Sequence, residues 1–114
     1  MKTTLPAKLT VIAFLVGGVS CWPARAGDVT ENWNANCAAC HGKDGKGQTK
    51  MGPKLGVKDF TDAKFQGTFD DAQAAKAIKE GITKNDSLKM KAFGDKFSDD
   101  EIKARVAHVR SFKQ

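Results

Sequence analysis

Apolar residues recur at helical spacing in three segments of the chain, and the segments between them are rich in glycine and polar residues. In the first segment, Val29, Trp33 and Cys37 follow one another at four-residue steps, which predicts one apolar helix face. Asp28 and Glu31 have the spacing of a capping box, so we expect this helix to begin at Asp28.

A second helix is predicted from Asp70 to Glu80. Asp70 and Gln73 have capping-box spacing, and Gly81 stands at the position where a glycine commonly ends a helix. The apolar face of this helix is modest and consists of Ala74, Ala75, Ile78 and Ile82.

The C-terminal helix has the clearest start. Ser98 and Glu101 form another capping-box pair, and Phe97 and Ile102 occupy the positions of a hydrophobic staple. The apolar face continues to the C-terminus through Val106, Val109 and Phe112. No alternating apolar–polar run bounded by hairpin turns occurs, so we predict no strand and an all-α fold class.

Long loops separate the predicted helices. Residues 41–56 contain five glycines and a proline, residues 83–97 form a second loop, and residues 59–65 hold a short helical turn. A domain of this size with few large apolar residues often needs a disulfide, a metal or a large cofactor for stability. The apolar residues of these loops therefore suggest that they pack on a bulky buried group.

The first 26 residues have a different pattern. Lys2 and Lys8 make a basic start, residues 9–19 are an apolar run, and "ARA" at 24–26 is a small-residue cleavage site. The run is shorter than the about 20 residues that a membrane-spanning helix needs. We therefore predict that residues 1–26 are a cleaved secretory signal peptide and that the protein has no stable membrane insertion.

The remaining residues, 27–114, form one small domain, which we expect in the periplasm. "GVSC", ending at Cys21, faintly resembles a lipoprotein cleavage box, so a lipid anchor at Cys21 stays open as a minor alternative. The full chain has 19 basic and 13 acidic residues. Cleavage would remove three basic residues, Lys2, Lys8 and Arg25, so the mature chain would have 16 basic and 13 acidic residues and a net charge of +3. This mild charge and the predicted export argue against nucleic-acid binding.

Cys37, Cys40 and His41 form a C-x-x-C-H motif. Structural zinc needs four ligands, and the other histidine, His108, lies far away in the last helix. A redox dithiol would follow a strand, and a disulfide ring this short would stabilise little and leave His41 unexplained. The remaining interpretation is covalent attachment of haem c, in which both thiols bind the vinyl groups and the histidine binds the iron.

These residues and others in the same order resemble class I, mono-haem cytochrome c of the bacterial exported type, over nearly the whole mature chain. "GPKL" (52–55) follows the cysteine motif, Met90 lies in "KMKAFGDKFSDDEI", and the last helix ends in "VAHVRSF". The resemblance implies a cytochrome c fold in which the N- and C-terminal helices pack across each other. In that fold, loops enclose one covalently bound haem c.

The resemblance also implies roles for single residues. Pro53 resembles the proline whose carbonyl accepts a hydrogen bond from Nδ1–H of the ligating histidine, His41, and such a bond orients the ring. Met90 resembles the sixth iron ligand, and a His/Met pair raises the reduction potential. With both axial positions filled, the expected function is one-electron transfer, and the protein is not expected to be an enzyme.

Three residues have competing interpretations. Met51 is a rival for the ligand role of Met90, although it precedes the "GP" on the histidine side of the haem. Met90 could instead fill a gap in the core, as methionines usually do. For His108 we expect a partly buried packing role, because the family often has an aromatic residue there that packs on the first helix.

The chain departs from the family pattern at two helix positions. Val29 stands where many members have a glycine eight residues before the first cysteine, and Arg105 stands where leucine is common. We therefore expect a helix crossing that is either wider or polar at Arg105 and His108. The chain has no tyrosine, so phenolic partners for the haem propionates are absent.

Lysines are frequent in both loops, and they are expected to dock the protein to acidic patches on redox partner proteins as a monomer. They are Lys43, Lys46, Lys50, Lys54, Lys58, Lys84, Lys89, Lys91 and Lys96. Three alternatives remain open at this point. The protein could be a ligand-binding or sensing haem protein with a labile Met90, a weak peroxidase, or the electron-accepting subunit of one dehydrogenase.

Overall fold

The structure is a computed structural model that describes residue 18 and residues 26–114. The elements are α1 (Ala26–Asn36), α2 (Ala38–His41), α3 (Gly52–Leu55), α4 (Ala63–Gln66), α5 (Asp71–Glu80), β1 (Ile82–Lys84), β2 (Ser87–Met90) and α6 (Asp99–Ser111). The predicted signal peptide with Cys21 lies almost entirely outside the described residues and stays a prediction. Among the residues that are described, no helix is both long enough and apolar enough to cross a membrane.

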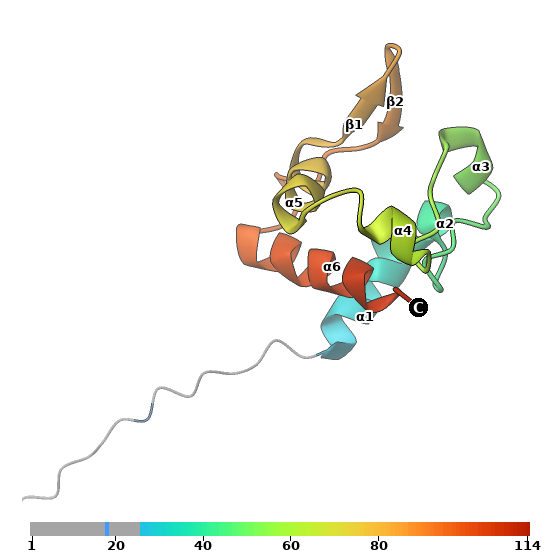
Figure 1. Ribbon diagram of the computed structural model, residues 1–114. Coiled ribbons are helices and arrows are strands. Elements are labelled where there is room, and N and C mark those ends of the chain that lie inside the picture. The colour runs from blue at the N-terminus through green and yellow to red at the C-terminus, as the bar shows by residue number, and fades with distance from the viewer. Residues whose placement is uncertain (1–17, 19–25) are drawn as a thin grey trace, which may run out of the picture.

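The first and last helices cross each other, and they lie together at the bottom of Figure 1. Trp33 of α1 is only 3% exposed, and its ring centroid is 5.0 Å from that of His108 and 5.1 Å from that of Phe112. The predicted packing of the terminal helices and of His108 is thus confirmed. The helix α1 begins at Ala26 and not at Asp28. Asp28 therefore lies in the first turn, where a negative carboxylate interacts favourably with the helix dipole.

Both capping boxes of the later helices are present. The Asp70 side chain accepts a hydrogen bond from the Gln73 N–H at 2.7 Å, and the Gln73 side chain accepts one from the Asp70 N–H at 2.9 Å. Ser98 and Glu101 are paired in the same way. Each pair satisfies backbone N–H groups that the first helical turn leaves free, so α5 and α6 begin where the sequence predicts.

The predicted hydrophobic staple is part of an apolar cluster formed by α5, the start of α6 and the segment before it. Phe97 and Ile102 are buried together with Phe93, and the Phe93 and Phe97 rings stack with centroids 5.4 Å apart. The cluster connects the start of α6 to α5 and to the end of β2 through three partly buried neighbours, Ala75, Ile78 and Met90.

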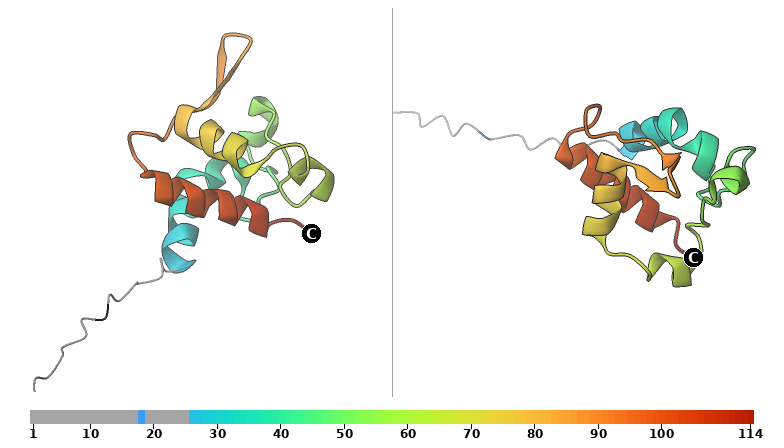
Figure 2. Two further views of the ribbon diagram at one scale, coloured as in Figure 1. Left: turned by 60° about the vertical axis from the view of Figure 1, so that its left-hand side comes forward. Right: turned by 90° about the horizontal axis from the view of Figure 1, so that it is seen from above.

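The chain between α5 and α6 forms an antiparallel hairpin of β1 and β2, which projects from the helices (Figure 2). The prediction of a plain loop over residues 83–97, without a strand, was therefore wrong. Asn85 and Asp86 have φ angles of 51° and 56°, and a type I′ hairpin turn requires positive φ at both central positions. Because asparagine and aspartate adopt this conformation more readily than most residues, this pair was the missed signal. The fold is helical with one small sheet.

Arg110 connects the C-terminal helix to the segment between α4 and α5. Its Nε donates to Asp71 Oδ1 at 2.8 Å, its Nη2 to the Phe69 carbonyl at 2.8 Å, and its Nη1 to the Gln66 carbonyl. Gln66 is itself buried, and its amide donates to the Val109 carbonyl at 2.8 Å. The planar guanidinium therefore holds three chain segments at once.

We expect Arg110→Lys to lower the free energy of unfolding by about 1–3 kcal/mol, because lysine keeps the charge but cannot donate in three fixed directions. Urea unfolding of the purified protein measures this change. Lys103→Met, at an exposed position of the same helix, is the control and should stay within about 0.5 kcal/mol of the wild type. Equal stability of Arg110→Lys and the wild type would contradict the expectation.

Candidate cofactor site

The two cysteines and the histidine of the motif lie on one turn that follows α1. Cys37 directly precedes α2, its N–H donates to the Trp33 carbonyl at 2.8 Å, and its carbonyl accepts from the His41 N–H at 2.9 Å. The Trp33 indole Nε1 donates to the Gly42 carbonyl at 2.8 Å, so it holds the far end of the turn. Cys37 and Cys40 are both half-buried, and they are not joined in a disulfide. The turn therefore presents three potential ligating or nucleophilic atoms.

His41 is held between aromatic rings. Its ring is stacked on Phe60 with centroids 4.9 Å apart, and it lies 5.6 Å from Trp33. Burial lowers the pKa of His41 from 6.5 to about 4, so the imidazole is neutral at neutral pH. A neutral imidazole has one ring nitrogen with a free lone pair, which is the form that binds metals.

Thr49 joins the cysteine turn to the next short helix, α3. Its hydroxyl donates to the Cys40 carbonyl at 2.8 Å and accepts from the Gly52 N–H at 2.9 Å. Sequence reasoning did not single out Thr49. The signal that was available is a threonine three residues before a glycine–proline pair, because threonine side chains often bond backbone groups at a turn.

Pro53 stands in the first turn of α3, whose residues contact α2. The Nδ1 atom of His41 is buried and has no hydrogen-bond partner within the described part of the chain. The Pro53 carbonyl accepts instead from the Gly56 N–H, at 3.4 Å. The bond from His41 to Pro53 that the resemblance implies is therefore not formed in this structure, although the two residues lie on adjacent elements.

The two candidate methionines belong to different projecting elements of the molecule. Met90 is half-buried at the end of β2 and packs on the cluster around Phe93, whereas Met51 precedes α3 and is 40% exposed. In Figure 1, the β1–β2 hairpin lies above α5, and α3 lies next to α2. The hairpin and α3 are separated from each other in this view. Met51 is thus on the side of His41, as the sequence indicated, and Met90 comes from the hairpin side.

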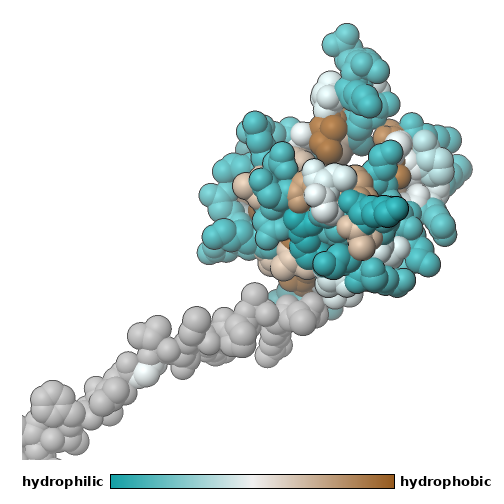
Figure 3. Space-filling model, viewed as in Figure 1, coloured by the Kyte–Doolittle hydropathy of each residue, from teal (hydrophilic) through white to brown (hydrophobic). Residues whose placement is uncertain are grey.

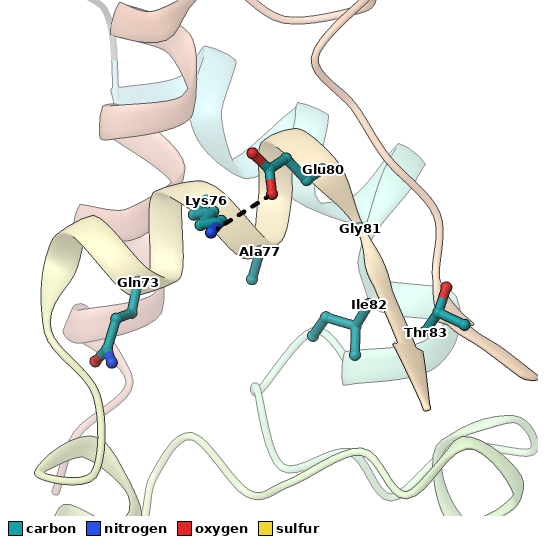
Figure 4. A pocket seen from close by; sticks show the side chains of 7 residues that line it. All are labelled: Gln73, Lys76, Ala77, Glu80, Gly81, Ile82 and Thr83. Carbon is teal, nitrogen blue, oxygen red and sulfur yellow. Dashed lines mark ion pairs between the residues drawn. The ribbon is translucent and has the colours of Figure 1, made fainter. Parts of the chain in front are cut away.

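Apolar groups are exposed where the hairpin leaves α5. Ile82 is 43% and Leu88 61% exposed, and Figure 3 shows hydrophobic surface at the base of the projection. An open hollow of about 420 Å³ lies next to it, and Gln73, Ala77 and Ile82 point to the same side there (Figure 4). Single exposed apolar side chains are ordinary on a protein surface, so these two do not by themselves mark a binding site.

The donor set of this site fits a covalently bound haem. Within residues 26–114 no three His, Cys, Asp or Glu side chains come together as a metal-binding cluster. The turn offers two thiols for thioether bonds and a neutral imidazole, His41, whose buried Nδ1 can carry the ring proton so that Nε2 has the lone pair for a metal. Met90 adds a thioether sulfur from another element, and imidazole with thioether is a known axial pair for haem iron.

Comparison with known proteins identifies the family. Residues 24–109 match the family model described as "Cytochrome C oxidase, cbb3-type, subunit III". The solved structure named "KustC0563 c-type cytochrome" is 34% identical, with a TM-score of 0.66 over 75% of this chain and 96% of that chain. The structure of a Kustc0563 mutant is 35% identical, with a TM-score of 0.65 over 75% and 99% of the two chains. No curated protein matches the chain.

The family match covers most of the chain, and the similar structures have the same class of fold as the helical domain described above. The helix crossing, the C-x-x-C-H turn and the donor set agree with this class. The chain therefore belongs to the family described as cytochrome c oxidase, cbb3-type, subunit III, and it is a mono-haem c-type cytochrome that carries covalently bound haem c.

Proposed function

We propose that this cytochrome is an exported one-electron carrier, in which Cys37 and Cys40 attach the haem and His41 and Met90 bind its iron. The bound haem supplies the redox chemistry, a one-electron change at iron. The observation that carries the proposal is the turn after α1, where two thiols and a neutral imidazole occur within five residues. The protein supplies attachment, orientation and access.

His41 is suited to remain a ligand over a wide pH range. Its pKa of about 4 means that protons do not compete for the ring at neutral pH, and the Phe60 ring limits its rotation. Its buried Nδ1 needs an acceptor, and we assign this role to the Pro53 carbonyl on the adjacent helix α3. Such a bond would fix the tautomer and raise the basicity of the ligating nitrogen.

The position of Met90 depends on the glycine that ends α5. Gly81 has a φ of 76°, and a Cβ atom there would lie 2.6 Å from the Met90 carbonyl oxygen. Only glycine allows this approach of α5 to the end of β2. If His41 and Met90 both held the iron, they would leave no open position for oxygen or peroxide, which would favour electron transfer over an enzymatic role.

The surface charge is consistent with docking to acidic redox partners. Lys54 of α3 and Lys84 of β1 are exposed, and Figure 1 shows α3 and the hairpin projecting to the same side of the molecule. The other loop lysines are also exposed or half-buried: Lys43, Lys46, Lys50, Lys58, Lys89, Lys91 and Lys96. We propose that the protein acts as a monomer in the periplasm and docks through this positive side.

A second candidate function follows from the family description, which names an oxidase subunit. In that case the domain would be bound permanently to a larger redox enzyme. Affinity purification from membranes and from the soluble fraction distinguishes the two. A carrier is recovered alone, whereas a subunit is recovered with one partner in equal amounts, and it keeps that partner at high salt.

We expect Cys37→Ala and Cys40→Ala each to leave at most one thioether bond to the haem. Mass spectrometry of the denatured protein and the pyridine haemochrome spectrum count these bonds. Cys21→Ala, in the predicted signal peptide, is the matched control and should leave both bonds intact. Two thioether bonds in either Cys37→Ala or Cys40→Ala would contradict the proposed attachment, and the intact mass also gives the cleavage site.

Met90→Ala should open the sixth iron position. We expect the reduction potential to fall by a substantial part of the ~0.8 V range that axial ligands span, and we expect the reduced variant to bind carbon monoxide. Optical titration measures both properties, with Met51→Ala as the control that should behave as the wild type. Binding of carbon monoxide by the reduced wild-type protein at neutral pH would indicate a ligand-binding function instead.

The positive side should make electron transfer depend on salt. We expect the rate with anionic hexacyanoferrate to fall several-fold from low to physiological ionic strength, and the rate with a cationic ruthenium hexaammine to rise. Stopped-flow absorbance measures both rates. The double variant Lys54→Glu, Lys84→Glu should weaken this dependence, whereas Lys103→Glu on α6 should change it less. A salt dependence that is the same for both reagents would contradict the docking model.

A further inference from the structure

Arg105 is a buried cation that forms no ion pair with any side chain in the described part of the chain. Only 3% of this α6 residue is exposed. Its Nη1 donates to the Glu101 carbonyl at 2.7 Å, but its Nε and Nη2 are buried without a hydrogen-bond partner in the part of the chain that is described. The guanidinium carbon lies 3.5 Å from the centroid of the Phe97 ring.

Stability does not explain this residue. Burying a charge with two unsatisfied nitrogens costs free energy, and apolar replacements of buried charged groups are often neutral or stabilising. The contact with the Phe97 ring offsets part of that cost. A cation kept at such a position calls for a functional explanation.

The surroundings of Arg105 place its charge next to both proposed haem-binding segments. Phe97 belongs to the cluster on which Met90 packs. The neighbouring Lys96 donates to Asn36 Oδ1 at 2.6 Å, so this segment also lies along the end of α1 that leads into Cys37. In agreement, burial raises the pKa of the Cys37 thiol, and Arg105 is the charged group that most strongly opposes this rise.

We propose that Arg105 sets the reduction potential of the haem upward through its buried positive charge. The inference rests on the proposed function, because it takes Cys37 as a point of haem attachment. When a partner delivers one electron, the ferric site becomes ferrous and its charge falls by one. A fixed positive charge nearby therefore stabilises the reduced form relative to the oxidised form.

The size of this effect follows from Coulomb's law. A unit charge at roughly 10 Å in a medium of effective dielectric constant about 20 changes a one-electron equilibrium by roughly tenfold. An exposed lysine on the same helix has a much smaller effect, because water and salt screen it. Burial is thus the property that makes Arg105 effective.

Arg105→Met tests the proposal, because methionine is similar in length and uncharged. We expect the ferric-to-ferrous ratio at a fixed applied potential to rise about tenfold. For a one-electron couple, this corresponds to a fall of about 59 mV in the reduction potential of the haem. Lys103→Met removes the same charge from an exposed position of α6 and should shift the ratio by less than about twofold. Spectroelectrochemical titration gives these values, and Arg105→Lys should restore most of the wild-type potential.

Thermal unfolding and mass spectrometry separate this role from a structural one. Arg105→Met should unfold at the wild-type temperature or above it and retain both thioether bonds. Where Arg105→Met does not fold, Arg105→Gln provides the uncharged variant. An unchanged potential in a folded uncharged variant, or an equal fall in Lys103→Met, overturns the inference. The proposed haem attachment has a different test: it is contradicted if Cys37→Ala keeps two thioether bonds, whatever the reduction potential of the Arg105 variants.

Discussion

The Trp33 indole is the contact that joins the fold to the cofactor site. On one side its ring packs against His108 and Phe112 at the helix crossing, and on the other it lies 5.6 Å from His41. Its Nε1 also holds the Gly42 carbonyl at 2.8 Å. Because one rigid side chain makes all these contacts, the direction of the cysteine turn follows from the way the terminal helices cross. Haem orientation would in turn depend on this packing.

The opposite side of the site is built more locally. The Asn85–Asp86 turn closes the hairpin, and Gly81 lets the end of α5 approach the Met90 carbonyl. The Met90 side chain is then held by the apolar cluster at the start of α6. Two different packing units thus carry the proposed axial ligands, a terminal-helix crossing for His41 and a capped helix with a hairpin for Met90.

Prediction from sequence succeeded where a short stretch decides the structure. The capping boxes at Asp70 and Ser98 are bonds between residues three apart, so their spacing was sufficient. The hairpin was missed because its strands are three and four residues long and show little alternation. The Thr49 bridge was missed because its hydroxyl bonds a carbonyl nine residues earlier, and such a partner depends on the path of the loop.

The sequence by itself determined the three longer helices, the family resemblance and the candidate attachment residues, because these depend on local spacing and residue chemistry. It did not reveal the short helix α3, which lies in the segment predicted to be a loop. It left two possibilities for the helix crossing, wider or polar, and only the tertiary structure decided that Arg105 enters the interior. The structure also decided that this cation lies over the Phe97 ring and that no carboxylate of residues 26–114 pairs with it. The electrostatic environment of a buried group is made by residues that are distant in sequence, and that is why folding, and not spacing, determines it.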